Sequence, residues 1–241
     1  MLSALGSEKS LRDKFNDNGK SDYSFWIAGF GRDTNHLIDE SQEAEKYLLQ
    51  FKEALEGSKD FQEFLRLNID LGILHVERGD PEKGKERLEE MMAIVKEKEL
   101  DKTFTYPPYI MWGLSSLVDA CARVGDRAGV ETWTRKAAEM AGTHKSDQVA
   151  GFEAVIQGRA LVSEKKFAES RAQYEKAVRL LRKGIFVQAF AGCLRELGEV
   201  YLGSGDEAGA KKAFAEASEV YRKMGANAYL EKVTAAAASL N

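Results

Sequence analysis

Hydrophobic residues recur every three or four positions along most of the chain, and short polar or glycine-containing stretches interrupt this period. The pattern is clearest between Phe190 and Met224, where a break at Gly205-Asp206 separates two such runs. The hydrophobic positions of the two runs are Leu194, Leu197, Tyr201, Ala210, Phe214 and Ala217. This spacing predicts two amphipathic helices joined by a tight turn.

Comparable turns are predicted at Gly79, Gly125, Lys165 and Gly205, which are 46, 40 and 40 residues apart. The pattern predicts helix pairs near 25–57, 61–100, 108–142, 149–183 and 187–224. An isolated pair of this length cannot bury its hydrophobic faces, so neighbouring pairs must stack. We therefore predict an all-α solenoid of stacked antiparallel helix hairpins. Residues 25–240 would form a single domain after a polar lead-in, 1–24, and a helix near 226–240 would cap the C-terminal end.

The composition agrees with a helical protein in water, because 44% of the 241 residues are hydrophobic, 31% are charged and only three are prolines. Lys and Arg alternate with Glu and the net charge is −4, which argues against a nucleic-acid partner, since that requires a clustered basic face. The chain lacks a run of 18 apolar residues and a secretory signal, so we expect a cytoplasmic location and no membrane contact. Cys121 and Cys193 fall at hydrophobic helical positions and are interpreted as reduced core residues.

Small and large residues recur at fixed places in these pairs. In the last pair they are Leu194, Leu197-Gly198, Tyr201, Gly205-Asp206, Ala210, Phe214 and Ala217, and in an earlier pair they are Leu71-Gly72, His75, Gly79-Asp80, Leu88 and Met91. This pattern resembles the tetratricopeptide repeat (TPR), and the resemblance implies a right-handed superhelix whose hairpins close around small residues. The period is longer than the usual ~34 residues, and the usual proline is missing. In its period of about 40 residues the chain resembles the long TPR regions of bacterial signalling and transcription regulators.

The sequence shows no motif for catalysis or metal binding. His36, His75 and His144 lie far apart, and His75 occupies a position expected in the core. The glycine-containing stretch from Gly29 to Asp33 is not followed by the Lys-Ser/Thr of a phosphate-binding loop. We therefore predict that the protein is not an enzyme and that it holds no metal or cofactor.

The remaining candidate surface is the concave groove that the first helices of stacked hairpins create. Helical spacing, together with the geometry implied by the TPR resemblance, predicts that the groove is lined by Arg66, Ile69, Ile73, Trp112, Asp119, Phe152, Val155, Arg159, Arg195 and Glu199. The aromatic residues would anchor a partner, and the arginines would hold carboxylates by forked hydrogen bonds. The alternative is that half of these side chains only pack between hairpins.

Two functions fit such a groove. The first is a non-catalytic interaction or scaffold module that binds a protein or peptide. The alternative is the ligand-sensing regulatory domain of a bacterial signalling or transcription regulator, in which a small-molecule effector shifts an equilibrium between arrangements. The apolar stretch from Phe25 to Phe30 adds self-association as a further hypothesis.

Overall fold

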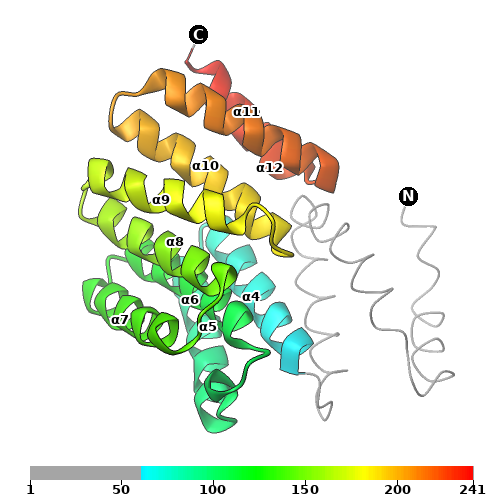
Figure 1. Ribbon diagram of the computed structural model, residues 1–241. Coiled ribbons are helices and arrows are strands. Elements are labelled where there is room, and N and C mark those ends of the chain that lie inside the picture. Colours follow the sequence, from blue (N-terminus) through cyan, green and yellow to red (C-terminus); the bar gives the residue numbers. More distant parts are fainter. Residues whose placement is uncertain (1–60, 241) are drawn as a thin grey trace, which may run out of the picture.

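The computed structural model describes residues 61–240, and these residues form nine α-helices and no β-strand (Figure 1). The helices are α4 (Phe61–Glu77), α5 (Pro81–Glu97), α6 (Pro107–Arg123), α7 (Arg127–Thr143), α8 (Asp147–Ser163), α9 (Phe167–Leu181), α10 (Val187–Gly203), α11 (Glu207–Met224) and α12 (Asn227–Ala238). A short 3-10 helix, η2 (Leu100–Lys102), precedes α6. The predicted lead-in, 1–24, and the predicted pair at 25–57 lie outside the described residues, so the division into domains stays a prediction.

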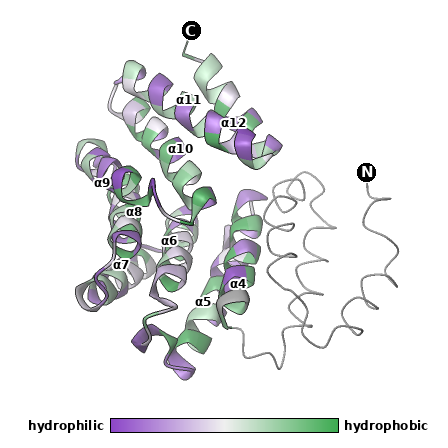
Figure 2. Ribbon diagram, turned by 45° about the vertical axis from the view of Figure 1, so that its right-hand side comes forward, coloured by the Kyte–Doolittle hydropathy of each residue, from purple (hydrophilic) through white to green (hydrophobic). Residues whose placement is uncertain are grey.

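Consecutive helices pack as antiparallel hairpins, namely α4 with α5, α6 with α7, α8 with α9 and α10 with α11. The hairpins stack in chain order, and α12 covers the last hairpin by packing on α11. Figure 2 shows hydrophobic and hydrophilic residues on different sides of most helices, as the three- to four-residue period requires. The predicted fold class, an all-α solenoid with a C-terminal capping helix, is confirmed.

The turns inside three hairpins share one construction, in which a glycine in the left-handed region is followed by an aspartate that caps the next helix. The φ angles of Gly79, Gly125 and Gly205 are 85°, 75° and 80°, and the following aspartates accept hydrogen bonds from backbone N–H groups of the next helix. In the remaining hairpin Lys165 itself adopts a φ of 62°, and Lys166 provides no side-chain cap. The turn at Lys165 therefore forms at the predicted position, although it contains no glycine.

Glycines on the first helix of a hairpin allow a large side chain of the second helix to lie against the backbone. A Cβ atom at Gly198 would lie 2.4 Å from the Phe214 ring, and one at Gly158 would lie 2.8 Å from the Tyr174 ring. Both aromatic side chains are almost fully buried. The small-against-large packing implied by the TPR resemblance is therefore present.

Phe186, in the loop between α9 and α10, lies among aromatic rings of α6 and α8. Its ring centroid is 5.0 Å from that of Tyr109, 5.6 Å from that of Trp112 and 5.2 Å from that of Phe152, in edge-to-face arrangements. Such contacts contribute about 0.5–1.5 kcal/mol each beyond the area that they bury. Trp112 and Phe152 were predicted to anchor a partner. In the structure their side chains are only 8% and 1% exposed, and both pack against the ring of Phe186 in the same chain.

Candidate functional site

The stacking of the hairpins changes at α10. Among the described helices, α6 packs closely on both α4 and α8, whereas α10 packs mainly on α9 and α11. A hollow of about 370 Å³ lies between α6, α8, α9 and α10. Its lining residues are Asp119, Ala122, Arg123, Arg159, Val162, Ser163, Phe167, Tyr174, Arg195, Glu196, Glu199 and Val200. We refer to this space as the hollow.

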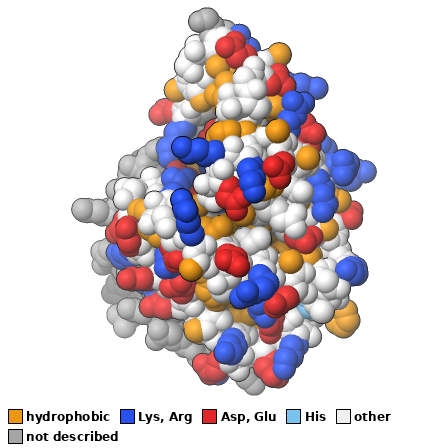
Figure 3. Space-filling model, turned by 90° about the vertical axis from the view of Figure 1, so that its left-hand side faces the viewer, with side chains coloured by type: hydrophobic (Ala, Val, Ile, Leu, Met, Phe, Trp, Pro, Cys, Tyr) orange, Lys and Arg blue, Asp and Glu red, His pale blue; other side chains and the backbone are white. Residues whose placement is uncertain are grey.

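Charged side chains of opposite sign lie in pairs at the hollow. Arg123 donates a hydrogen bond from Nε to Oδ2 of Asp119 at 3.0 Å, and Arg195 donates from Nη1 to Oε1 of Glu199 at 2.8 Å. The side chains of Arg123 and Glu199 are 44% and 53% exposed. Arg123 and Glu199 are thus the more exposed members of their pairs, and both can contact a ligand from the solvent side. On the face drawn in Figure 3, acidic and basic side chains are likewise interspersed, with hydrophobic atoms between them.

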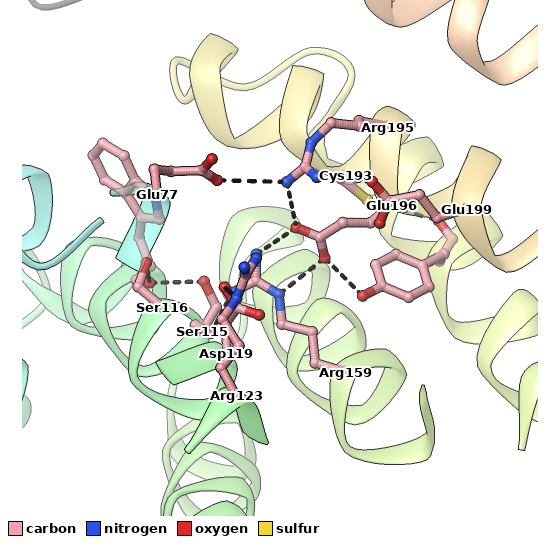
Figure 4. A network of polar contacts seen from close by, with 12 residues as sticks. Glu77, Ser115, Ser116, Asp119, Arg123, Arg159, Cys193, Arg195, Glu196 and Glu199 are labelled. Atoms are coloured by element: carbon pink, nitrogen blue, oxygen red, sulfur yellow. Dashed lines mark hydrogen bonds and ion pairs between the residues drawn. The ribbon is translucent and has the colours of Figure 1, made fainter. Parts of the chain in front are cut away.

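A buried ion pair between Arg159 and Glu196 joins α8 to α10 (Figure 4). Arg159 donates from Nε to Oε2 at 2.9 Å and from Nη2 to Oε1 at 2.6 Å, and the Tyr174 hydroxyl donates to Oε2 at 2.7 Å. Arg159 also donates from Nη1 to the backbone carbonyl of Ser115 on α6. Both partners of the ion pair are more than four-fifths buried. One guanidinium and one carboxylate therefore connect α6, α8, α9 and α10.

The electrostatics of this pair keep it charged. Burial alone would raise the pKa of Glu196, but Arg159, Arg195 and the Tyr174 hydroxyl lower this pKa to about 2. Burial and the nearby Glu196 carboxylate raise the pKa of Tyr174. At neutral pH Glu196 is a carboxylate and Tyr174 is a neutral hydrogen-bond donor.

Arg195 lies among three carboxylates from two helices. Besides its bond to Glu199, its Nη2 is 3.7 Å from Oε1 of Glu196 and 3.9 Å from Oε1 of Glu77 on α4. Its Nε is buried and makes no hydrogen bond within the described part of the chain. Arg195 thus connects the hollow with a second space beside Glu77.

This second space, which we call the inner cavity, has a volume of about 70 Å³ and is lined by Ile73, Val76, Glu77, Trp112, Ser115, Ser116, Asp119, Phe152, Val155, Arg159, Gln188, Ala189, Gly192, Cys193, Arg195, Glu196, Tyr221 and Tyr229. A water molecule takes roughly 30 Å³ in the liquid, whereas ligand pockets measure roughly 300–1,000 Å³. The hollow therefore has the size of a ligand site, and the inner cavity has the size of a water site.

The side chains of Glu77 and Lys232 connect the first and last described helices, α4 and α12. Lys232 donates from Nζ to Oε2 of Glu77 at 2.7 Å, and its Nζ lies 5.6 Å from the centroid of the Tyr229 ring. Tyr229 in turn stacks on Tyr221 of α11 at 5.2 Å. Burial would raise the pKa of Glu77, but Arg195 and Lys232 outweigh it and hold the pKa below its usual value.

Most of the side chains predicted for the groove do come together. Those that line the inner cavity are Ile73, Trp112, Asp119, Phe152, Val155, Arg159 and Arg195, and Glu199 lines the hollow. Ile69 is fully buried, and a Cβ atom at Gly113 would lie 3.3 Å from its Cγ1, so Ile69 packs between α4 and α6. Arg66 lines neither space and lies 3.8 Å from Asp70 on the same helix.

Sequence reasoning missed Glu196, Glu77, Tyr174 and Lys232. For Glu196 a signal existed, because it follows Gln188 and Gly192 at helical spacing on one face of α10. For Glu77 and Lys232 no local signal existed, since 155 residues separate them.

We also searched residues 61–240 for metal sites, membrane-spanning helices and reactive cysteines. In this range no three His, Cys, Asp or Glu side chains are grouped as a metal site requires, and no helix is long and apolar enough to cross a membrane. Cys121 and Cys193 are free and buried, and burial raises the pKa of both thiols. His75 is 3% exposed, as expected of a core residue.

The stacked hairpins, their Gly-Asp turns and their small-against-large packing define a TPR-like helical-repeat protein. No family model matches the sequence, and no curated protein matches it. Solved structures share the fold at low identity.

Three of the matching solved structures are the following. BtubC from P. vanneervenii has a TM-score of 0.54 at 16% identity, with 92% of this chain and 89% of that chain covered. PlcR of Bacillus thuringiensis, solved in complex with the peptide PapR7 and DNA, has a TM-score of 0.57 at 15% identity, with 90% and 76% covered. A signal transduction ATPase with a tetratricopeptide repeat sensor from Pyrococcus horikoshii has a TM-score of 0.47 at 15% identity, with 97% and 33% covered. At these identities the similarity concerns the fold alone.

Proposed function

We propose that this protein is a non-catalytic interaction module that binds a peptide or a protein segment in the hollow. The observation that carries the proposal is the hollow between α6, α8, α9 and α10, which has a volume of about 370 Å³ and is lined in part by the exposed charges of Arg123 and Glu199. This volume lies within the roughly 300–1,000 Å³ of small ligand pockets, and it suits one or two side chains of an extended partner.

The chemistry of the hollow suggests what the partner presents. Val162, Phe167 and Val200 offer apolar surface for a hydrophobic side chain. Arg123 and Glu199 offer one charge of each sign to its neighbours. Arg159 is not expected to bind the partner, because Glu196 already accepts hydrogen bonds from both Nε and Nη2 of its guanidinium. The fold that is shared with PlcR, which was solved with a peptide, supports a peptide partner.

A second candidate is a small-molecule effector that binds the same hollow in a regulatory domain. The volume of the hollow favours it, since one compact ligand with a carboxylate or an amine fits between the charged pairs. Both candidates use the same residues, so one set of variants tests them together.

Ser163→Trp tests the hollow most directly. Ser163 is exposed at the end of α8 and lines the hollow, so a large side chain there fills the space without replacing a core residue. We expect a random peptide phage library selected on the full chain to yield peptides that bind the wild-type protein and lose at least tenfold in affinity for Ser163→Trp. Arg123→Ala is expected to weaken the same peptides by about two- to fivefold, as the loss of an exposed charge contact of roughly 0.5–1 kcal/mol implies.

The matched control is Lys223→Ala, which breaks an exposed ion pair of the same i, i+4 spacing on α11, 2.6 Å long and away from the hollow. Peptides should bind this variant as they bind the wild type. Equal binding to Ser163→Trp would rule out the hollow as the site. If no peptide is selected but a metabolite screen finds a compound that raises the melting temperature of the wild type and not of Ser163→Trp, the effector is the correct candidate.

A further inference from the structure

One side of α4 faces the core that the described residues share. Leu65 and Ile69 belong to this core, and a Cβ atom at Gly72 would lie 2.5 Å from Cγ of Leu88 on α5. Among the described helices, α4 packs mainly on α5 and α6. The positions of Leu65, Ile69 and Gly72 therefore mark the side of α4 that packs on these two helices.

Three leucines lie on the opposite side of α4 and are nevertheless buried. Leu67, Leu71 and Leu74 each follow one of the core-facing positions by two residues, which is a rotation of about 200° in a helix of 3.6 residues per turn. They do not belong to the core that the described residues share, yet they are only 3%, 0% and 3% exposed. Another part of the protein therefore keeps water away from this side of α4.

Asp70 lies on the same side, three residues after Leu67 and four before Leu74. Its side chain is 12% exposed, and burial raises the pKa of its carboxyl to about 6. The covered surface thus extends over two turns of α4 and includes a carboxyl group.

We propose that residues 41–55, which lie outside the described part of the chain, form a helix that packs antiparallel to α4 over Leu67, Leu71 and Leu74. This interface lies away from the hollow, whose lining residues come from α6, α8, α9 and α10. The inference therefore goes beyond the proposed function and does not depend on it.

The sequence that precedes α4 fits this surface. Residues 1–60 lie before α4, whereas Asn241 alone follows the described part of the chain. The connection to α4, residues 56–60, is polar and has the length of the loops that join antiparallel helices. Within residues 41–55 hydrophobic residues recur every three or four positions, namely Tyr47, Leu48, Phe51 and Leu55. This stripe can cover the three leucines in the way that a second helix covers the first in a hairpin.

Disulfide formation in the full chain tests the contact. Phe51→Cys with Leu67→Cys places two thiols on the sides that are proposed to face each other. Glu53→Cys with Leu67→Cys is the matched control, because position 53 lies about 200° from position 51 on the predicted helix. Both variants carry Leu67→Cys, so any loss of stability from this substitution is common to them. The native Cys121 and Cys193 are buried and are present in both.

We expect mild oxidation to link the first pair at least fivefold faster than the control pair. In an equal mixture of unlabelled and ¹⁵N-labelled chains, peptide mass spectrometry should find the link within one chain. Equal rates for the two pairs, or no link in either, would overturn the proposal. Links that join labelled to unlabelled chains would also overturn it, because a second copy of the protein would then cover α4.

Discussion

The guanidinium of Arg159 and the carboxylate of Glu196 form two hydrogen bonds that join α8 to α10 beside the hollow. Arg159 was expected to bind the carboxylate of a partner. In the structure it instead binds the carboxylate of Glu196 in the same chain. Because Arg159 and Glu196 bind each other, other residues of the hollow must contact a partner. The contribution of the pair to the stability of the fold can be measured.

We expect Glu196→Gln to lower the free energy of unfolding by about 3 kcal/mol, because it leaves the Arg159 charge buried without its counter-charge. Urea denaturation at pH 7 measures this loss. The double variant Arg159→Met, Glu196→Leu should be more stable than Glu196→Gln, since it removes both charges and fills the space with apolar atoms. A double variant that is less stable than the single one would show that the pair stabilises the fold beyond mutual neutralisation.

Asp70 on α4 gives a pH-dependent prediction. Burial raises the pKa of this carboxyl from 3.8 to about 6, although Arg66 opposes the change. The folded state therefore binds more protons than the unfolded state between these values, and stability falls as pH rises from about 4 to 6. Asp70→Asn should increase the free energy of unfolding by about 3 kcal/mol at pH 7.5 and by about 1 kcal/mol at pH 4.5. Equal gains at both pH values in urea denaturation would contradict a buried charge as the cause.

The turn between α8 and α9 should become more stable when Lys165 and Lys166 are replaced by the Gly and Asp of the other turns. Lys165 adopts a φ of 62°, which L residues with a Cβ adopt at a cost, so Lys165→Gly should stabilise the protein by about 0.5–1 kcal/mol. Lys166→Asp adds the missing cap and should contribute about 1 kcal/mol more. The reciprocal change Gly205→Lys should destabilise the protein by a similar amount to the gain from Lys165→Gly. Melting temperatures that move in the same direction for both changes would contradict this explanation.

Two glycines of α10 should respond oppositely to alanine. A Cβ atom at Gly198 would lie 2.4 Å from the buried Phe214 ring, so Gly198→Ala should cost about 1–3 kcal/mol through overpacking. At Gly192 the nearest atom, the Tyr221 hydroxyl oxygen, is 4.0 Å away, so Gly192→Ala should be neutral or should stabilise the helix by up to about 1 kcal/mol. Thermal unfolding of the two variants checks the contrast, and an equal loss in both would show that the hairpin tolerates no methyl group on this helix.

The sequence predicts the helices and turns well because their signals are local. Pro107 and Pro108 open α6, because a proline is tolerated in the first turn of a helix, and the turn at Lys165 is placed correctly by the period alone. The inward direction of Asp119, Arg159 and Arg195 was expected from helical spacing together with the geometry that the TPR resemblance implies, and all three line the inner cavity.

The partners of these side chains do not follow from spacing. Phe186 fills the space beside Trp112 because the α9–α10 loop folds inward, and Glu196 meets Arg159 because α10 packs on α9. Both contacts depend on how one hairpin packs on the next. The residue pattern within a single hairpin does not predict this packing. The open groove expected from the family geometry is therefore partly filled by the chain itself.

The Glu77–Lys232 contact also bears on how the chain folds. In an ordinary solenoid each repeat touches its neighbours only, so the two ends unfold without regard to each other. Here a contact across 155 residues joins the first and last described helices. Contacts of such sequence separation slow folding, because a large loop-closure entropy opposes their formation. A displacement of α12 therefore acts on α4 directly as well as through the three hairpins between them, so that this contact couples the two ends of the described stack.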